Sequence, residues 1–358
     1  LNAVSTFEHD DAVQPVAAGR FAYFAQSRNN NTAIREYYAD DDTLTNDGID
    51  ITVAVQTLIP KNAFQIISNS IEDTLFVLCH DTNNANTAPY AAGQNVNPTN
   101  ANTIYIYKYF FDKGEKVQTA WSKWTFAGAE ILGAVSVESF LYVLANEGQS
   151  TKLYKVDLQN LNDTGLTFKV YLDLKASVGA TYNAVTGLST FTSPYGAKAG
   201  LVAVDTASGV KLEATNTTGS TYTVPANVTN VFIGVPFTST YILSPQFVRE
   251  ETGRGRLAIS SGRYQIRTIT FDFADTGFFK VQVTPKGRDA GTTEMTGYII
   301  GEATTLIDAP PIISGNLRVP IQARNTDVDV QIISDSHLPV HITQAEVEGF
   351  YHRRSRRI

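Results

Sequence analysis

The sequence has a single cysteine, Cys79, and so lacks the second thiol that an internal disulfide needs. Cys79 follows the apolar run Leu75–Leu78, and we interpret it as a buried, inert thiol rather than a nucleophile. No run of 18 apolar residues occurs, so the sequence predicts no membrane-spanning helix. No stretch keeps a helical period over more than two turns, which argues against a helical bundle.

Motifs for metals, nucleotides and covalent catalysis are also missing. The five histidines have no zinc spacing, and no Gly-rich loop is followed by Lys-Ser or Lys-Thr. The acidic run Asp40–Asp42, followed by Asp47 and Asp50, lacks the Gly and Glu of a calcium-binding EF-hand loop. We interpret it as a solvated acidic loop, with weak Ca²⁺ binding as the alternative. The sequence thus predicts no cofactor and no metal site.

Basic residues are outnumbered by acidic ones, 28 to 35, which gives a net charge of −7. This balance argues against a dedicated nucleic-acid-binding protein. The densest basic run lies at the end of the chain, close to Glu346 and Glu348, and consists of Arg353, Arg354, Arg356 and Arg357. We expect at least one of these arginines to pair with a carboxylate in this chain or a neighbouring one; the alternative is a solvated tail.

Aromatic and β-branched residues are plentiful, with 19 Phe and 17 Tyr, and they favour strands. The sequence therefore predicts an all-β fold. A unit made of an apolar strand, a loop and a second strand that exposes Tyr or Lys occurs three times, which suggests partial β-propeller blades. Antiparallel β platform domains are predicted to follow these blades. An ordinary antiparallel meander is the alternative. The paired runs are 21–25 with 33–38, 74–78 with 103–108, and 140–144 with 152–156; the runs 64–67 and 131–135 precede the second and third pairs.

The predicted domain organisation has four parts. Residues 1–18 form an irregular leading segment, and 19–165 form the propeller-like blades. Residues 166–232 form a small β domain or platform, with strands at 201–204 and 221–224. Residues 233–358 form a carboxy-terminal antiparallel β domain, with strands at 317–321 and 328–332. Closing a propeller takes about four to eight blades, so the remaining blades would lie in an absent amino-terminal part or be supplied from further along the chain.

The clearest strand signal begins at Arg263. Tyr264 and Ile266 alternate with polar residues, but the following apolar residues, among them Phe271, have the opposite parity. In a regular strand, this one-residue change of parity would turn the later apolar residues toward solvent. A β-bulge would keep them on the buried face, so we predict one near Arg267–Thr268.

A hairpin is predicted directly after this strand. Residues 274–277 read as a four-residue loop in which Gly277 takes positive φ, and residues 279–283 read as the returning strand. Asp275 and Gly277 also belong to an Asp-Thr-Gly tripeptide of the kind found in aspartic proteases. Those enzymes need two such aspartates, and only one copy occurs here. We therefore interpret both residues as structural.

Several stretches together resemble one family, the tail tubular protein B family. These proteins are the tail nozzles of short-tailed bacteriophages of the autographivirus type. The resemblance begins near Gly19, and because family members are considerably longer at the amino end, we interpret the chain as a carboxy-terminal portion. The matching stretches are Tyr171–Asp173 (YLD), Thr190–Tyr195 (TFTSPY), Gly234–Ser239 (GVPFTS), Arg256–Leu257, Arg263–Arg267 (RYQIR), Asp275–Val281 (DTGFFKV), Leu338–Ile342 (LPVHI), Glu348–Tyr351 (EGFY) and Arg353–Arg357 (RRSRR).

The resemblance implies a structural, non-enzymatic protein at the tail tip of a virion. It implies a hexameric ring below the tail adaptor (tail tubular protein A), with surfaces for tail fibres and a channel through which DNA passes without sequence-specific binding. The alternative is a glycan-binding or glycan-degrading β-propeller tail protein. Partial blades would expose unpaired edges and apolar surface, so we expect the chain alone to be poorly soluble or to associate.

Overall fold

The computed structural model describes residues 8–39, 46–80, 102–112, 115–148, 150–252, 255–259, 262–297 and 309–353. Its regular structure there consists of antiparallel strands and one 3-10 helix, η1 (Val53–Val55), so the prediction of an all-β fold is confirmed. The chain forms two compact units, Leu1–Gln159 and Asn160–Ile358, and each is described by itself.

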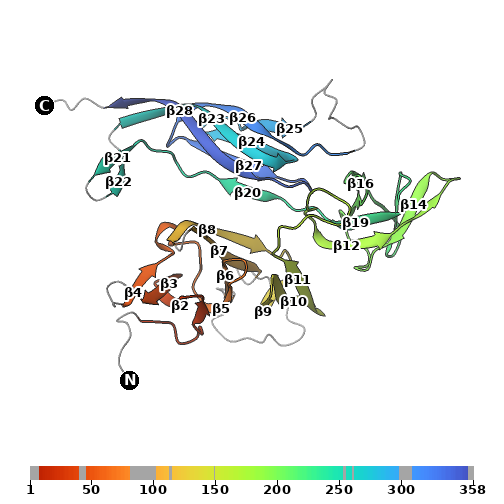
Figure 1. Cartoon of the computed structure of the whole chain (residues 1–358), viewed down its shortest axis with the longest axis horizontal. Coiled ribbons are helices and arrows are strands. Elements are labelled where there is room, and N and C mark those ends of the chain that lie inside the picture. Colours follow the sequence, from red (N-terminus) through yellow and green to blue (C-terminus); the bar gives the residue numbers. More distant parts are fainter. Residues whose placement is uncertain are drawn as a thin grey trace. The chain divides into compact units, whose positions relative to one another are not determined.

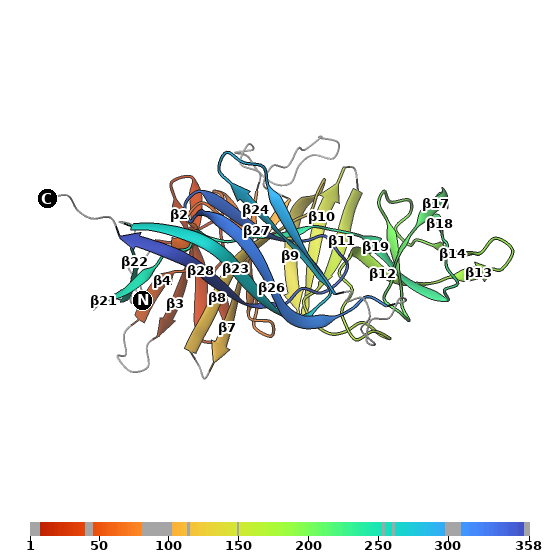
Figure 2. The same cartoon turned by 90° about the horizontal axis from the view of Figure 1, so that it is seen from above.

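The first unit contains three antiparallel sheets in which strands consecutive in the sequence pair with one another (Figure 1). The sheets follow one another in chain order, from red to yellow in Figure 2. Sheet A contains β1 (Val16–Ala18), β2 (Phe21–Arg28), β3 (Asn31–Ala39) and β4 (Asn46–Asp50); sheet B contains β5 (Ala63–Asn69), β6 (Thr74–Cys79), β7 (Thr103–Asp112) and β8 (Glu115–Thr125); sheet C contains β9 (Glu130–Val137), β10 (Phe140–Glu147) and β11 (Ser150–Asp157).

Sheet B is the middle layer of the three, and both of its faces are covered. On β6, Leu75 and Val77 pack with side chains of sheet A, whereas Phe76 and Leu78 pack with side chains of sheet C. This explains why β6 is a continuous apolar run rather than an alternating one. Cys79 at its end is buried, as predicted, and burial raises the pKa of its thiol.

The second unit begins with a small β-sandwich. Its two sheets enclose a core that includes Phe191, Tyr222 and Ile233. Sheet D, in spatial order, contains β12 (Asp173–Gly179), β19 (Asn230–Val235), β15 (Val202–Asp205) and β16 (Lys211–Glu213); sheet E contains β13 (Thr181–Asn183), β14 (Leu188–Thr192), β18 (Thr221–Val224) and β17 (Thr215–Thr218).

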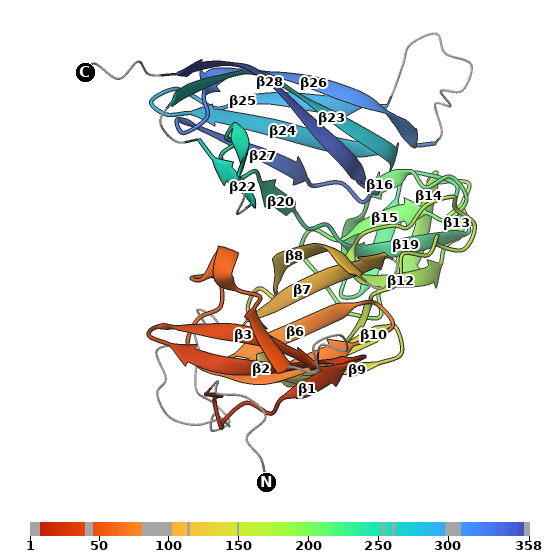
Figure 3. The same ribbon diagram turned by 60° about the vertical axis from the view of Figure 1, so that its left-hand side comes forward.

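A large β-sandwich follows, in teal to blue in Figure 3. The inner faces of its two main sheets form one core around Phe271, Phe279 and Val319. Sheet F, in spatial order, contains β20 (Ser239–Ile242), β27 (Val328–Ser334), β24 (Phe278–Pro285) and β25 (Gly291–Thr296); sheet H contains β26 (Ile313–Arg324), β23 (Gly262–Thr276) and β28 (Ile342–Arg353); β21 (Arg249–Thr252) and β22 (Gly255–Ala258) form a separate hairpin, sheet G.

The β-bulge predicted near Arg267–Thr268 is confirmed. The register of β23 shifts between Ile266 and Thr268 against both of its neighbours, β26 and β28. Against β28, Arg267 is the extra residue, whereas against β26 the extra residue lies on β26, between Pro320 and Ala323. The shift keeps Ile266, Ile269 and Phe271 on the buried face, which is the physical reason for the change of parity in the sequence.

The hairpin predicted after the bulge is wrong. β23 pairs with β26 and β28, whereas β24 pairs with β25 and β27, so the chain crosses from one sheet of the sandwich to the other at Gly277. Asp275, with a φ of 44°, takes the left-handed conformation that we assigned to Gly277. Gly277 is needed for another reason, because a Cβ there would lie 2.6 Å from the Cβ of Leu338.

Candidate assembly site

A buried ion pair joins sheets A and B in the first unit. The Nζ of Lys116, on β8, contacts the Oε2 of Glu36, on β3. The two side chains are only 15% and 6% exposed. Burying a carboxylate that deep is costly unless it has a partner, and Lys116 supplies that partner.

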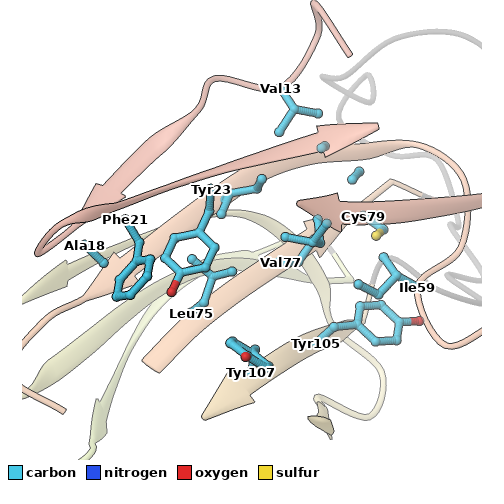
Figure 4. Packing of buried hydrophobic residues seen from close by; sticks show 14 of the residues in the cluster. Val13, Ala18, Phe21, Tyr23, Ile59, Leu75, Val77, Cys79, Tyr105 and Tyr107 are labelled. Atoms are coloured by element: carbon cyan, nitrogen blue, oxygen red, sulfur yellow. The ribbon is translucent and has the colours of Figure 1, made fainter. Parts of the chain in front are cut away.

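Aromatic rings surround this ammonium group. The nearest ring centroids belong to Phe21 of sheet A, at 4.6 Å from Nζ, and Tyr109 of sheet B, at 4.8 Å. Tyr107 and Phe111 lie at 5.6 Å and Tyr23 at 5.8 Å. Distances below about 6 Å are in the range of cation–π attraction. Figure 4 shows several of these side chains in the core between the two sheets.

We call the five rings around the Lys116 ammonium group the aromatic cage, and its three tyrosines have raised pKa values. Burial raises the pKa of Tyr109 to about 12 and also raises those of Tyr23 and Tyr107, with the charge of Glu36 acting in the same direction. The phenols therefore stay protonated at neutral pH and have no acid–base role there. The cage is a structural tie between two sheets. Sequence reasoning predicted the aromatic strand at 103–108 but gave no signal that would single out Lys116 or Glu36.

Side-chain hydrogen bonds connect the first strands of the three sheets. The amide group of Gln65, on β5, both donates to the carbonyl of Ala134 (2.9 Å) and accepts from its N–H (3.1 Å), on β9. The hydroxyl of Ser68, also on β5, donates to the carbonyl of Ala17 on β1 at 2.8 Å. The strands β1, β5 and β9 thus lie next to one another, beside a hollow of about 680 Å³ that all three line.

The face of sheet C that points away from sheet B carries exposed apolar side chains that no other sheet of the described residues covers; we call it the outer face of sheet C. Tyr142 lies opposite Val135, and Leu144 lies opposite Leu153. Val135 is 54% exposed and Leu153 65%. Val143 and its alternate neighbours are buried against sheet B. The outer face also carries polar residues, because Lys155 lies opposite Tyr142. Its apolar residues Val135, Tyr142, Leu144 and Leu153 line one hollow, and an exposed apolar patch of this kind has the character of a packing surface.

The predicted structural residues fall in different places. Asp275 and Gly277 lie together at the crossing between the two sheets of the large sandwich. The backbone of Arg353 pairs with that of Gly262 at the end of β28. The side chain of Arg353 lies outside the described part of the chain, as do Arg354, Arg356 and Arg357.

An arginine–carboxylate pair does occur nearby, between Glu348, which lies close to the arginine run in the sequence, and Arg318, which the sequence does not single out. Arg318 of β26 donates to Glu348 of β28 at 2.8 Å, and the hydroxyl of Thr268 donates to the same oxygen at 2.7 Å. These contacts span the full width of sheet H. No sequence signal pairs Arg318 with Glu348, because their strands become near neighbours only when β23 lies between them.

The acidic run Asp40–Asp42 lies outside the described residues. Asp50 is described, and its carboxylate binds Arg28 and Thr52. Burial raises the pKa of Asp50, but the hydrogen bonds from Thr52 and Arg28 outweigh burial and lower it. Among the described residues, no three or more His, Cys, Asp or Glu side chains form a group that could hold a metal ion. The same residues contain no helix with the length and apolar character needed to cross a membrane.

The chain resembles known proteins in sequence. The family described as "Bacteriophage nozzle protein" matches residues 1–358. Tail tubular protein gp12 of Escherichia phage T7 is 26% identical over 374 aligned residues, which cover 99% of this chain and 45% of that protein. The chain therefore spans less than half the length of this relative.

Likenesses to solved structures are weak. An exo-β-1,3-galactanase from Phanerochaete chrysosporium gives a TM-score of 0.25 at 11% identity, over 95% of this chain and 96% of that one. A sialidase from Trypanosoma rangeli gives 0.21 at 10% identity, over 91% of each chain. Values this low carry no functional argument.

Proposed function

Because the chain belongs to the bacteriophage nozzle protein family, we propose that it forms part of a hexameric tail nozzle whose channel carries the genome out of the virion. Membership of this family makes it a structural component of the virion tail. The ring sits below the tail adaptor and supports the tail fibres. Its role is structural rather than enzymatic.

Sheets A, B and C act as three consecutive blades of a β-propeller. Three observations support this. Each sheet pairs its strands in chain order, the sheets pack face to face in series, and their first strands β1, β5 and β9 lie next to one another. The remaining blades come from the part of the longer protein that this chain does not include, and one of them covers the outer face of sheet C. The exposed apolar patch on this face, which includes Val135, Leu144 and Leu153, is the structural observation that carries the proposal.

Self-association of the isolated chain tests this assignment. We expect the chain to associate at micromolar concentration because the outer face of sheet C is uncovered, and Leu153→Lys to reduce association, since a charge there opposes burial. Leu161→Lys is the matched control, because Leu161 is equally exposed, at 65%, but lies outside sheet C. Sedimentation velocity gives the readout. A chain that is monomeric throughout, or two variants that behave alike, would contradict the assignment.

A nozzle channel must let DNA pass without holding it. Each lysine or arginine that contacts a phosphate adds salt-sensitive affinity, with a slope of about −0.9 in log K against log salt, so a basic lining would act as a brake. The net charge of −7 supports a lining that is neutral or acidic on balance.

We therefore expect no measurable binding of duplex DNA at physiological salt. A mobility-shift titration with one duplex at low and moderate salt measures this, and its control is a basic DNA-binding protein titrated under the same conditions. Binding at micromolar concentration or below that persists at moderate salt would mean that the channel grips DNA.

A further inference from the structure

His337 lies at the junction between the small and the large sandwich of the second unit. It belongs to the connection between β27 and β28. The backbone N–H of Tyr171, in the segment that leads into the small sandwich, donates to the carbonyl of His337 at 2.9 Å. The ring Nε2 lies 2.9 Å from the carbonyl of Gly209, in the turn between β15 and β16. The backbone carbonyl and the ring of His337 are thus both hydrogen-bonded to the small sandwich or to the segment that leads into it.

An apolar cluster surrounds this point. The next residue, Leu338, is buried together with Phe168, Val202 and Phe232, and Phe278 of the large sandwich packs against the same cluster. The connection that carries His337 therefore forms part of the contact between the two sandwiches, and His337 is only 6% exposed.

The hydrogen bond to Gly209 fixes the tautomer of the ring. A carbonyl can only accept, so Nε2 carries the hydrogen and Nδ1 is left as an acceptor. Nδ1 is buried and has no hydrogen-bond partner in the described part of the chain. A proton arriving at Nδ1 would become a buried N–H without an acceptor, on a cation removed from water.

The charges near the ring oppose protonation as well. Lys211 of β16 lines the same hollow as His337 and carries a positive charge, although it also pairs with the carboxylate of Glu213 on β16 at 3.1 Å. Asp335 also lines this hollow, but its carboxylate is bound to Lys280 of β24. Burial lowers the pKa of His337, the bond to Gly209 partly opposes this, and Lys211 lowers it further.

We propose that His337 is a pH-sensitive latch that holds the two sandwiches together when neutral and releases them when protonated. Opening the junction exposes the ring to water and frees Nδ1 to bind a proton. A histidine that is harder to protonate in the closed state stabilises that state fully above the ordinary pKa of about 6.5. This stabilisation is lost as the pH falls below 6.5 toward the lower pKa of the closed state.

Hydrogen exchange of the Tyr171 amide in the full chain measures the opening. After correction for the intrinsic exchange rate, its protection should fall about tenfold between pH 7.5 and pH 5.5, one unit below the ordinary histidine pKa. The amide of Asp205, which bonds to Val210 inside the small sandwich, is the internal control and should keep its protection.

His337→Gln keeps a donor for Gly209 but cannot titrate, so it should remove the pH dependence at Tyr171. His80→Gln is the matched control, because burial also lowers the pKa of His80, which lies in the first unit; it should leave the dependence intact. If His337→Gln does not fold, an NMR titration of the ring in the unmodified chain decides the matter. Titration of His337 at or above pH 6.5, or an unchanged pH dependence in His337→Gln, would overturn the proposal.

Discussion

Replacing Lys116 with alanine is expected to lower the free energy of unfolding of the first unit by about 3–5 kcal/mol, the usual effect of removing one partner from a buried ion pair. The change leaves the carboxylate of Glu36, 6% exposed, unpaired between sheets A and B, and it empties a space surrounded by five rings. Chemical denaturation followed by tyrosine and tryptophan fluorescence measures the loss, because Trp121 and Trp124 both lie on β8.

Lys123→Ala is the control for this experiment. Lys123 lies on the same strand as Lys116 but is exposed, and exposed substitutions usually change stability by less than about 0.5 kcal/mol. The double variant Lys116→Met with Glu36→Leu removes both charges and fills the space with apolar atoms. It should recover much of the loss, since the cost lies in the unpaired charge rather than in the absence of the pair. Equal effects of Lys116→Ala and Lys123→Ala would show that the ion pair does not tie the sheets together.

The second large effect is expected at the other face of sheet B. Phe76 is fully buried against sheet C, and Phe76→Ala should cost about 3–5 kcal/mol through lost burial and the cavity left behind. Phe110→Ala makes the same chemical change on β7 of the same sheet, where the ring is 57% exposed, and should be nearly neutral. Comparable losses in the two variants would argue that sheet C does not pack on sheet B.

Phe76→Ala also bears on assembly. Loss of packing between sheets B and C would free a second apolar face beside the outer face of sheet C. The variant should therefore associate more strongly than the unmodified chain in the sedimentation experiment. Lys116→Ala acts between sheets A and B instead, so its stability loss should leave the outer face of sheet C as it is.

The strands themselves were predictable from the sequence. The apolar runs at 21–25, 64–67, 131–135 and 140–144 all lie in strands of sheets A to C. The change of parity after Ile266 correctly located the bulge in β23. These features depend on which face of a strand is buried, and that information is written in the residues of the strand.

The partners of the strands and buried groups were decided only by the tertiary structure. Residues 274–277 have the composition of a hairpin loop, yet β23 and β24 belong to different sheets. Gly277 is required there because Leu338 packs where a Cβ of residue 277 would lie. Glu36 and Lys116 are 80 residues apart, and Gly209 and His337 are 128 apart. A local sequence pattern predicts that a residue is buried or that the chain turns. Which distant residue contacts it depends on how the sheets pack. The Lys116–Glu36 ion pair and the contacts of His337 at the sandwich junction therefore become visible only in the tertiary structure.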